Sequence, residues 1–213
     1  MSDLVFQSYI PANIRSKAVA KVIKIAKRFK FDPNALMIVI YKESKWNPKA
    51  QNSIKATGLI QWTVTTAKNV HGLTPDQIKA KGILEQLDLV EQYYAQPHLA
   101  SKVYSNYFDV YFAVFTHTLI GKSDNYVFAQ SGSSVYQNNS GLDVDNDGKI
   151  TVGNIKTWFK KGVPDWQIAY EQYVAPKVKY MWWIVPVIVI AGIIYYRKSK
   201  IILSFLNNSK SWF

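Results

Sequence analysis

Apolar residues recur at intervals of three and four in the first part of the chain, a spacing that is typical of amphipathic helices. In residues 12–30 the other positions carry mainly basic side chains, so this helix is predicted to cover an apolar core with a solvated basic face. Binding of a membrane or of nucleic acid by the same basic face is the alternative. Asp32-Pro33 is predicted to start a second helix, because Pro is favoured at the first helical position and the apolar run 35–41 follows.

Two later segments also have the pattern of helices. A Thr-Pro-Asp start precedes an apolar stripe in residues 74–95, and residues 107–119 are mostly apolar and aromatic. Residues 131–148 are rich in Ser, Asn, Gly and Asp and are predicted to form a loop. Since no convincing run of strands is present, the fold is predicted to be mainly α.

The C-terminal region contains the most apolar stretch of the sequence. Residues 180–196 carry no charge, have Trp and Tyr at the ends, and are flanked by Lys179 and Arg197. As a helix this stretch is about 25 Å long and, with aromatic and basic anchors, predicts a single transmembrane helix; a buried core helix is the alternative. The predicted organisation is a helical domain over 1–176, a juxtamembrane segment 177–179, the transmembrane helix 180–196 and a basic, interfacial tail 197–213.

Composition and charge narrow the possible functions. The 213 residues are 48% hydrophobic and include no cysteine, which excludes a disordered chain, disulfide frameworks and thiol catalysis. His71, His98 and His117 have no ligand-pair spacing, so no histidine-built metal site is predicted. Half of the net charge of +12 comes from the C-terminal segment 177–213, which favours a membrane as the partner and argues against nucleic acid.

Glu43 is the strongest candidate for catalysis. It follows a strongly apolar helical run and precedes Pro48, which is expected to end the helix. Burial against Ile40 and Trp46 would raise the pKa of this carboxyl and keep it protonated near neutral pH, as a general acid requires. On position alone, a surface glutamate at a helix end is the alternative.

The residues around Glu43 form an extended pattern. Glu43-Ser44 is followed by Asn47-Pro48 and Ala50, which read E-S-x-x-N-P-x-A, and then by G-L-x-Q in residues 58–61. This pattern resembles the signature of the soluble lytic transglycosylases and goose-type lysozymes. G-K-x-D-x-Y-V at 121–127 and G-x-x-x-Y-x-x-N-x-G-L-D at 132–143 are similar to a phage-type version of that family. The resemblance covers about residues 30–155 and implies a lysozyme-like helical fold for the domain 1–176.

The resemblance implies that Glu43 is the catalytic acid of a peptidoglycan lytic transglycosylase. Glu43 would protonate the oxygen between N-acetylmuramic acid and N-acetylglucosamine, and its ionised form would then take the proton of the C6 hydroxyl, giving a 1,6-anhydro product. Ordinary glycosidases need two carboxylates. The candidates Asp32 and Asp76 have no support from the family, so a single carboxylate assisted by the substrate's acetamido group fits the sequence better. Lysozyme-type hydrolysis is the second choice.

Five residues are candidates for substrate binding, and for Gln61 this role is implied by the same resemblance. Gln61 would hydrogen-bond the sugar beside the scissile bond, and Gly58 would let the loop backbone approach the sugar chain. Ser44 would either orient Glu43 or cap a turn. Trp62 and Tyr136 would stack on sugar rings, with core packing as the equal alternative.

An acidic loop follows Tyr136. Its alternating carboxylates resemble a calcium loop, in which oxygens converge on a hard cation and a glycine makes the sharp turn. The twelfth position is Asn154 where an EF-hand has a bidentate Glu, so the predicted binding is weak and structural, and an Asx-rich turn without metal is the alternative. No cofactor is required for catalysis. The candidate ligands are Asp143, Asp145, Asp147, the carbonyl of Lys149 and the side chain of Thr151.

Three hypotheses about function follow. The first is a membrane-anchored, single-pass lytic transglycosylase in the internal membrane of a phage virion, because the motifs are of phage type and the N-terminus lacks a secretory signal. It would open the host cell wall during genome entry, with peptidoglycan, lipid and other virion proteins as partners. The second is a bacterial tail-anchored enzyme of wall remodelling. The third is a non-enzymatic membrane or vertex protein that retains a wall-binding fold, against which the intact Glu43 and Gln61 argue.

Overall fold

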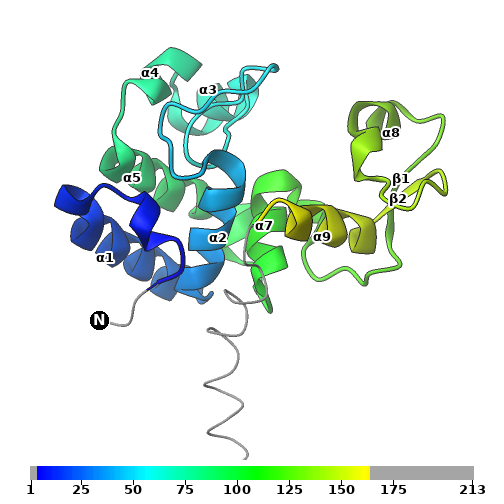
Figure 1. Cartoon of the computed structure of the whole chain (residues 1–213), viewed down its shortest axis with the longest axis horizontal. Coiled ribbons are helices and arrows are strands. Elements are labelled where there is room, and N and C mark those ends of the chain that lie inside the picture. Colours follow the sequence, from blue (N-terminus) through cyan, green and yellow to red (C-terminus); the bar gives the residue numbers. More distant parts are fainter. Residues whose placement is uncertain (1–3, 164–213) are drawn as a thin grey trace, which may run out of the picture. The chain divides into compact units, whose positions relative to one another are not determined.

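Four helices form the centre of the fold in the computed structural model, which describes residues 4–163 (Figure 1). Helix α1 (Ala12–Phe29) packs on α5 (Ile83–Tyr94) and on α2 (Pro33–Ser44), and α2 packs in turn on α7 (Tyr107–Phe115). Seven consecutive residues of α2, from Ala35 to Tyr41, are buried. The prediction of a mainly helical fold is therefore confirmed for the described residues.

The start of α2 follows from local chemistry, as the sequence predicted. The Asp32 carboxylate accepts a hydrogen bond from the backbone N–H of Asn34 at 2.8 Å, and Pro33 occupies the first turn. The helix ends at Ser44, four residues before Pro48, because Lys45 and Trp46 both adopt left-handed backbone conformations, with φ of 51° and 63°. This reversal turns the chain away from α2 directly after Glu43.

Two predicted helices are shorter than expected. Residues 74–95 form α4 (Pro75–Lys79) and α5 rather than one helix. Each has its own start signal, since a capping box at Thr74 begins α4 and the Glu85 side chain accepts from the Gly82 N–H at the start of α5. The segment 107–119 also divides, because Thr116 is extended (φ −163°), into α7 and the 3₁₀ turn η2 (His117–Leu119).

The absence of strands was predicted wrongly, and so was a loop throughout 131–148. Strands β1 (Val127–Gln130) and β2 (Lys149–Thr151) pair antiparallel, with Gln130 opposite Lys149. Between them lie α8 (Ser134–Asn139) and the 3₁₀ turn η3 (Ser140–Leu142), and α9 (Val152–Lys161) follows β2. Such short strands are stabilised by a partner distant in sequence, which a local pattern does not reveal.

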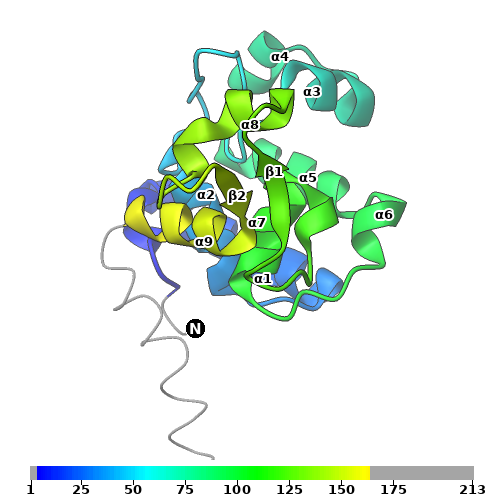
Figure 2. The same ribbon diagram turned by 90° about the vertical axis from the view of Figure 1, so that its right-hand side faces the viewer.

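The remaining elements surround the central helices. The loop 45–63, α3 (Val64–His71) and α4 lie together at the end of α2, whereas α8 and the sheet lie beyond α7 and α9 (Figures 1 and 2). Turn η1 (Gln7–Tyr9) precedes α1, and α6 (Pro97–Ala100) follows α5. None of the helices within residues 4–163 has the length and apolar character needed to cross a membrane. The predicted segments 177–179, 180–196 and 197–213 lie outside the described residues.

Candidate active site

Glu43 lies in the last turn of α2. Its side chain is half-buried, so part of it still reaches solvent, while protein atoms surround the carboxyl densely. Burial raises the pKa of Glu43 to about 7, in the direction predicted from the sequence, and the neighbouring Lys42 acts against this rise. Among residues 4–163 nothing forms a hydrogen bond or ion pair with this carboxyl. Glu43 is therefore a carboxyl that exchanges a proton near neutral pH.

Two tyrosines lie within electrostatic range of Glu43, and the sequence analysis assigned them no role. Burial is the main cause that raises the pKa of Tyr94 on α5 and of Tyr111 on α7, and the charge of Glu43 adds to both. The Tyr94 hydroxyl donates to the Val110 carbonyl at 2.8 Å. Both phenols stay un-ionised beside the carboxyl. Their only sequence signal was their place within predicted apolar helices.

Leu59, in the loop beside Glu43, is held at both its backbone polar groups. Its carbonyl lies 3.0 Å from the Ser44 hydroxyl, which also contacts the carbonyl of Ile40 at 3.1 Å. Its N–H donates to Gln86 Oε1 at 2.9 Å. These two contacts, which we call the Leu59 clamp, join the loop to α2 on one side and to α5 on the other. Ser44 thus secures the loop, and it does not bond Glu43 directly.

Gln86 organises the loop, although the sequence analysis gave it no role. Its side chain is fully buried, and Nε2 lies 2.7–3.1 Å from three backbone carbonyls. These belong to Pro48, Ile78 and Lys81. A buried amide that satisfies groups from three segments fixes their relative positions. The available signal was a polar residue beside apolar ones in the predicted helix 74–95.

Gly58 is a glycine for a reason different from the predicted one. It is buried, with φ of +80°, and a Cβ at this position would lie 2.6 Å from Gln86 Oε1. The close approach is to the protein itself, whereas a close approach to a sugar chain was expected. Gly58 therefore allows the loop to reach Gln86.

Gln61 is held by the turn that it closes. Its backbone is left-handed (φ 52°), and its Nε2 donates to the carbonyls of Gly58 at 3.0 Å and Ala50 at 3.3 Å. Within the described part of the chain, no group donates to its Oε1. The side chain is half-buried and lines a small pocket with Tyr93 of α5 and Val114 of α7. An acceptor oxygen is thus presented near the junction of these helices.

Trp62 is a core residue, which is the second of the two roles that the sequence allowed for it. Only 2% of its surface is exposed, and its ring meets the His71 ring edge-on, with 5.6 Å between the centroids. A side chain packed in this way offers no open face to a sugar. Bridges from Thr57 to Gln51 and to Trp62 close the base of the loop, whose tip includes Ile54, 72% exposed.

Tyr136 and the acidic loop form a second group, which no hydrogen bond or ion pair within residues 4–163 links to Glu43. The Tyr136 hydroxyl on α8 donates to Asp143 Oδ2 at 2.7 Å, and this hydrogen bond is the main cause that lowers the pKa of Asp143. Carboxylate oxygens of Asp143, Asp145 and Asp147 lie within 4.8 Å of one another. Tyr136 is half-buried and is tied to this loop through its hydroxyl.

Thr151, a later predicted ligand of the acidic loop, caps a helix. The Thr151 hydroxyl lies 2.7 Å from Asn154 Oδ1 and accepts from the Asn154 N–H at 3.1 Å, which caps the start of α9. Thr151 is therefore engaged, contrary to its expected role as a ligand. The candidate set that remains is the three aspartates and the carbonyl of Lys149 in β2.

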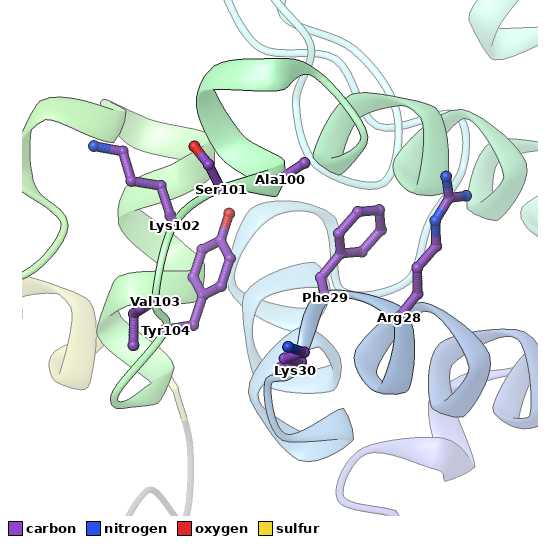
Figure 3. Close-up of a pocket in the computed structure, with 8 residues that line it drawn as sticks. All are labelled: Arg28, Phe29, Lys30, Ala100, Ser101, Lys102, Val103 and Tyr104. Carbon is purple, nitrogen blue, oxygen red and sulfur yellow. The ribbon is translucent and has the colours of Figure 1, made fainter.

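A pocket of about 230 Å³ lies at the end of α1, between Arg28–Lys30 and Ala100–Tyr104 (Figure 3). Figure 3 shows Phe29 and Tyr104 facing each other across it, with Lys102 directed away. None of the predicted site residues lines this pocket. It is therefore separate from Glu43 and Gln61.

Comparison with known proteins agrees with the resemblance found in the sequence. Residues 21–81 match the family model of the transglycosylase SLT domain, a segment that includes α2, Glu43, Gly58 and Gln61. No curated protein matches the chain. No solved structure matches it either. The family match supports the lytic transglycosylase and lysozyme-like family and a function that acts on peptidoglycan.

Proposed function

We propose that this protein is a lytic transglycosylase that cleaves the bond between N-acetylmuramic acid and N-acetylglucosamine in peptidoglycan. The observation that carries the proposal is Glu43, a partly buried carboxyl with a pKa of about 7 at the end of the helix that the family model covers. The Leu59 clamp holds Gln61 on the adjacent turn, with an acceptor oxygen available for a sugar hydroxyl or amide.

In the proposed reaction Glu43 begins protonated and donates its proton to the glycosidic oxygen as the bond to the anomeric carbon breaks. The acetamido oxygen of the muramic sugar stabilises the positive charge that develops at that carbon. The ionised carboxylate then removes the proton of the C6 hydroxyl, whose oxygen closes onto the anomeric carbon. Glu43 regains its proton, and the product has a 1,6-anhydro end. A pKa near 7 suits a group that serves as acid and then as base.

The two carboxylates considered as partners do not support a two-carboxylate mechanism. Asp32 caps the opposite end of α2, eleven residues from Glu43, which is about 16 Å along a helix. Carboxyl pairs in glycosidases lie about 5–9.5 Å apart. Asp76 on α4 is exposed and pairs with Lys79 at 3.1 Å. These positions favour the mechanism with a single carboxylate.

We also propose that the acidic loop holds a structural Ca²⁺. The support is the convergence of oxygens from Asp143, Asp145 and Asp147, together with the turn at Gly148, where φ is +82°. With Thr151 engaged in a helix cap, fewer protein ligands remain, and weak binding is expected. No step of the reaction depends on this ion.

The setting that we propose is a phage virion with an internal membrane. The support is the phage-type motif spacing in residues 121–143 and the apolar stretch 180–196 with basic flanks. Anchored in this way, the enzyme would open the host wall during genome entry. A bacterial tail-anchored enzyme and a non-enzymatic wall-binding protein are the competing assignments, and the chemistry of Glu43 argues against the latter.

The test is digestion of purified peptidoglycan by the full chain in detergent, with mass spectrometry of the released fragments. Anhydro ends are expected from the native protein, and Glu43→Gln is expected to lower the rate at least about 100-fold. Asp32→Asn is the matched control, because asparagine caps a helix as well as aspartate and activity should remain. Reducing ends would indicate a hydrolase, whereas a Glu43→Gln variant with a tenth of the native rate would require another acid.

A further inference from the structure

His98 and His117 lie side by side, although eighteen residues lie between them in the sequence. Their ring centroids are 4.6 Å apart, and the ring planes are inclined by 58°. His98 belongs to the short helix α6 and His117 to the turn η2, and both are exposed to solvent. The sequence spacing predicted no histidine pair, and only the fold brings the two rings together.

The backbone on both sides of the pair is anchored. Leu99 follows His98 and is fully buried, and Leu119 lies two residues after His117 with 1% exposure. Backbone hydrogen bonds close each turn, from the Leu99 N–H to Gln96 and from the Leu119 N–H to Thr116. The backbone positions from which the two rings extend are therefore fixed by buried neighbours.

The ring nitrogens of the pair are available to a ligand. Neither ring forms a hydrogen bond to any residue in the range 4–163, unlike His71, whose Nδ1 lies 3.3 Å from Gln92 Oε1. A neutral imidazole presents one nitrogen with a lone pair, which is the form that binds metals.

The separation of the rings suits a shared metal ion. Zinc–nitrogen bonds of about 2.0–2.1 Å in a tetrahedral site place two imidazole centroids about 5 Å apart. The observed 4.6 Å requires only a small adjustment of the side chains. We propose that His98 and His117 bind a divalent transition-metal ion of the zinc, nickel or copper class, with water completing the coordination. The nearby Lys102 opposes a second positive charge, which weakens the binding.

This proposed site differs in chemistry from the acidic loop. Imidazole nitrogens select borderline transition metals, whereas the aspartate oxygens of the loop select hard cations such as Ca²⁺. An ion held by both histidines would tie α6 to η2, the turn that follows α7. It would therefore stabilise this corner of the fold without entering the proposed reaction.

The test is calorimetric titration of the full chain in detergent with Zn²⁺, in a buffer with millimolar Ca²⁺ to occupy exposed carboxylates. One Zn²⁺ per chain is expected at pH 7.5, with loss of binding below about pH 6 as histidine becomes protonated. His98→Ala and His117→Ala should each weaken the affinity at least about tenfold, because one imidazole replaces two. His71→Gln is the matched control and should bind as the native protein does.

A second measurement separates a loss of ligand from a loss of fold. Without metal, both alanine variants should melt as the native chain does, since these side chains are exposed; with Zn²⁺ only the native chain and His71→Gln should melt at a higher temperature. The proposal is wrong if no stoichiometric binding occurs at 1 mM Zn²⁺. It is equally wrong if His98→Ala binds with native affinity.

Discussion

The carboxyl of Glu43 shows how an isolated acid at a helix end becomes a proton donor at neutral pH. Its pKa is raised mainly because protein atoms displace water, and no hydrogen bond from the described residues offsets this cost. The ionised form is therefore the unfavourable one in the folded state. A group of this kind supports the proposed chemistry and reduces stability at high pH.

We expect Glu43→Gln to be stabilising above pH 7. The folded state holds the Glu43 proton more tightly than the unfolded state, so the native chain loses stability as the pH rises from about 4.5 to about 7. The loss amounts to at most about 3 kcal/mol, and the amide variant does not suffer it. Thermal melting of both proteins in the same detergent at pH 5 and pH 8 measures the effect. A difference in melting temperature that is equal at the two pH values would contradict it.

The environment of a single residue was predictable from the sequence where its neighbours along the chain determine that environment. Glu43 follows a continuous apolar helical run, so its burial and raised pKa could be anticipated. Gly58 and Trp62 could not be interpreted in the same way. Their surroundings are Gln86 and His71, which come from segments later in the chain. The sequence indicated the motif, and the contacts in the structure explain why Gly58 and Trp62 occupy their positions in it.

At the scale of elements, α2, α5 and the loop between them act as one unit through the Leu59 clamp. Gln86→Leu is expected to lower the free energy of unfolding by at least about 3 kcal/mol, because the Leu59 N–H and backbone carbonyls lose a buried partner. The rate of peptidoglycan digestion should fall with it, since Gln61 is displaced. Gln137→Leu, at an exposed glutamine on α8, should change stability by no more than about 0.5 kcal/mol. Equal melting temperatures for the two variants would exclude the proposed role of Gln86.

Gly58→Ala tests the close packing of the same loop. A left-handed backbone costs alanine about 1 kcal/mol, and the contact of 2.6 Å with Gln86 should add about 1–3 kcal/mol. Gly72→Ala is the control, since Gly72 has φ of +65° but no atom within 4 Å of an added Cβ. Denaturant unfolding should therefore show a larger loss for Gly58→Ala. If both variants lost the same free energy of unfolding, the loop at Gly58 would be shown to shift away from Gln86 at little cost.

The acidic loop is expected to become more stable when calcium is present. Three neighbouring carboxylates repel one another until a cation neutralises them, and the expected dissociation constant is about 10⁻⁴–10⁻³ M. Millimolar Ca²⁺ should raise the melting temperature of the chain, and Asp145→Ala should remove that rise. Asp88→Ala, outside the loop, should keep it. Identical melting curves with Ca²⁺ and with a chelator would mean that the loop is an Asx-rich turn.

Elements were predictable where a helix has its own start signal and apolar face. Asp32-Pro33 and the stripe of α1 fall into this class. The sheet does not, because β1 and β2 are short and pair across more than fifteen intervening residues. The division of 74–95 was missed because the start signal at Thr74 and the apolar stripe that begins at Ile83 were read as one helix, whereas Gly82 starts a second one.

At the scale of the whole molecule, the predicted boundary at Pro176 separates the helical domain from the predicted transmembrane segment. Truncation after Pro176 is expected to give a protein that stays in the aqueous phase without detergent, because the sequence 1–176 contains no other apolar run comparable to 180–196. The full chain should enter the detergent phase of a two-phase extraction. Recovery of the full chain in the aqueous phase would count against the transmembrane prediction.

The loop that the Leu59 clamp holds has one part in which side chains can change and another in which they cannot. The bridge between Gln51 and Thr57 closes the loop, and the tip with the exposed Ile54 lies outside it. Substitutions at the exposed Ser53 and Ile54 are therefore expected to leave Gln61 and Glu43 in place, whereas Asn52 holds the turn through hydrogen bonds that its side chain accepts from the Ile54 and Ala56 N–H groups. The loop thus combines an exposed tip that tolerates change with a base that does not, so under the proposed function new substrate contacts can evolve at the tip while the positions of Glu43 and Gln61 are kept.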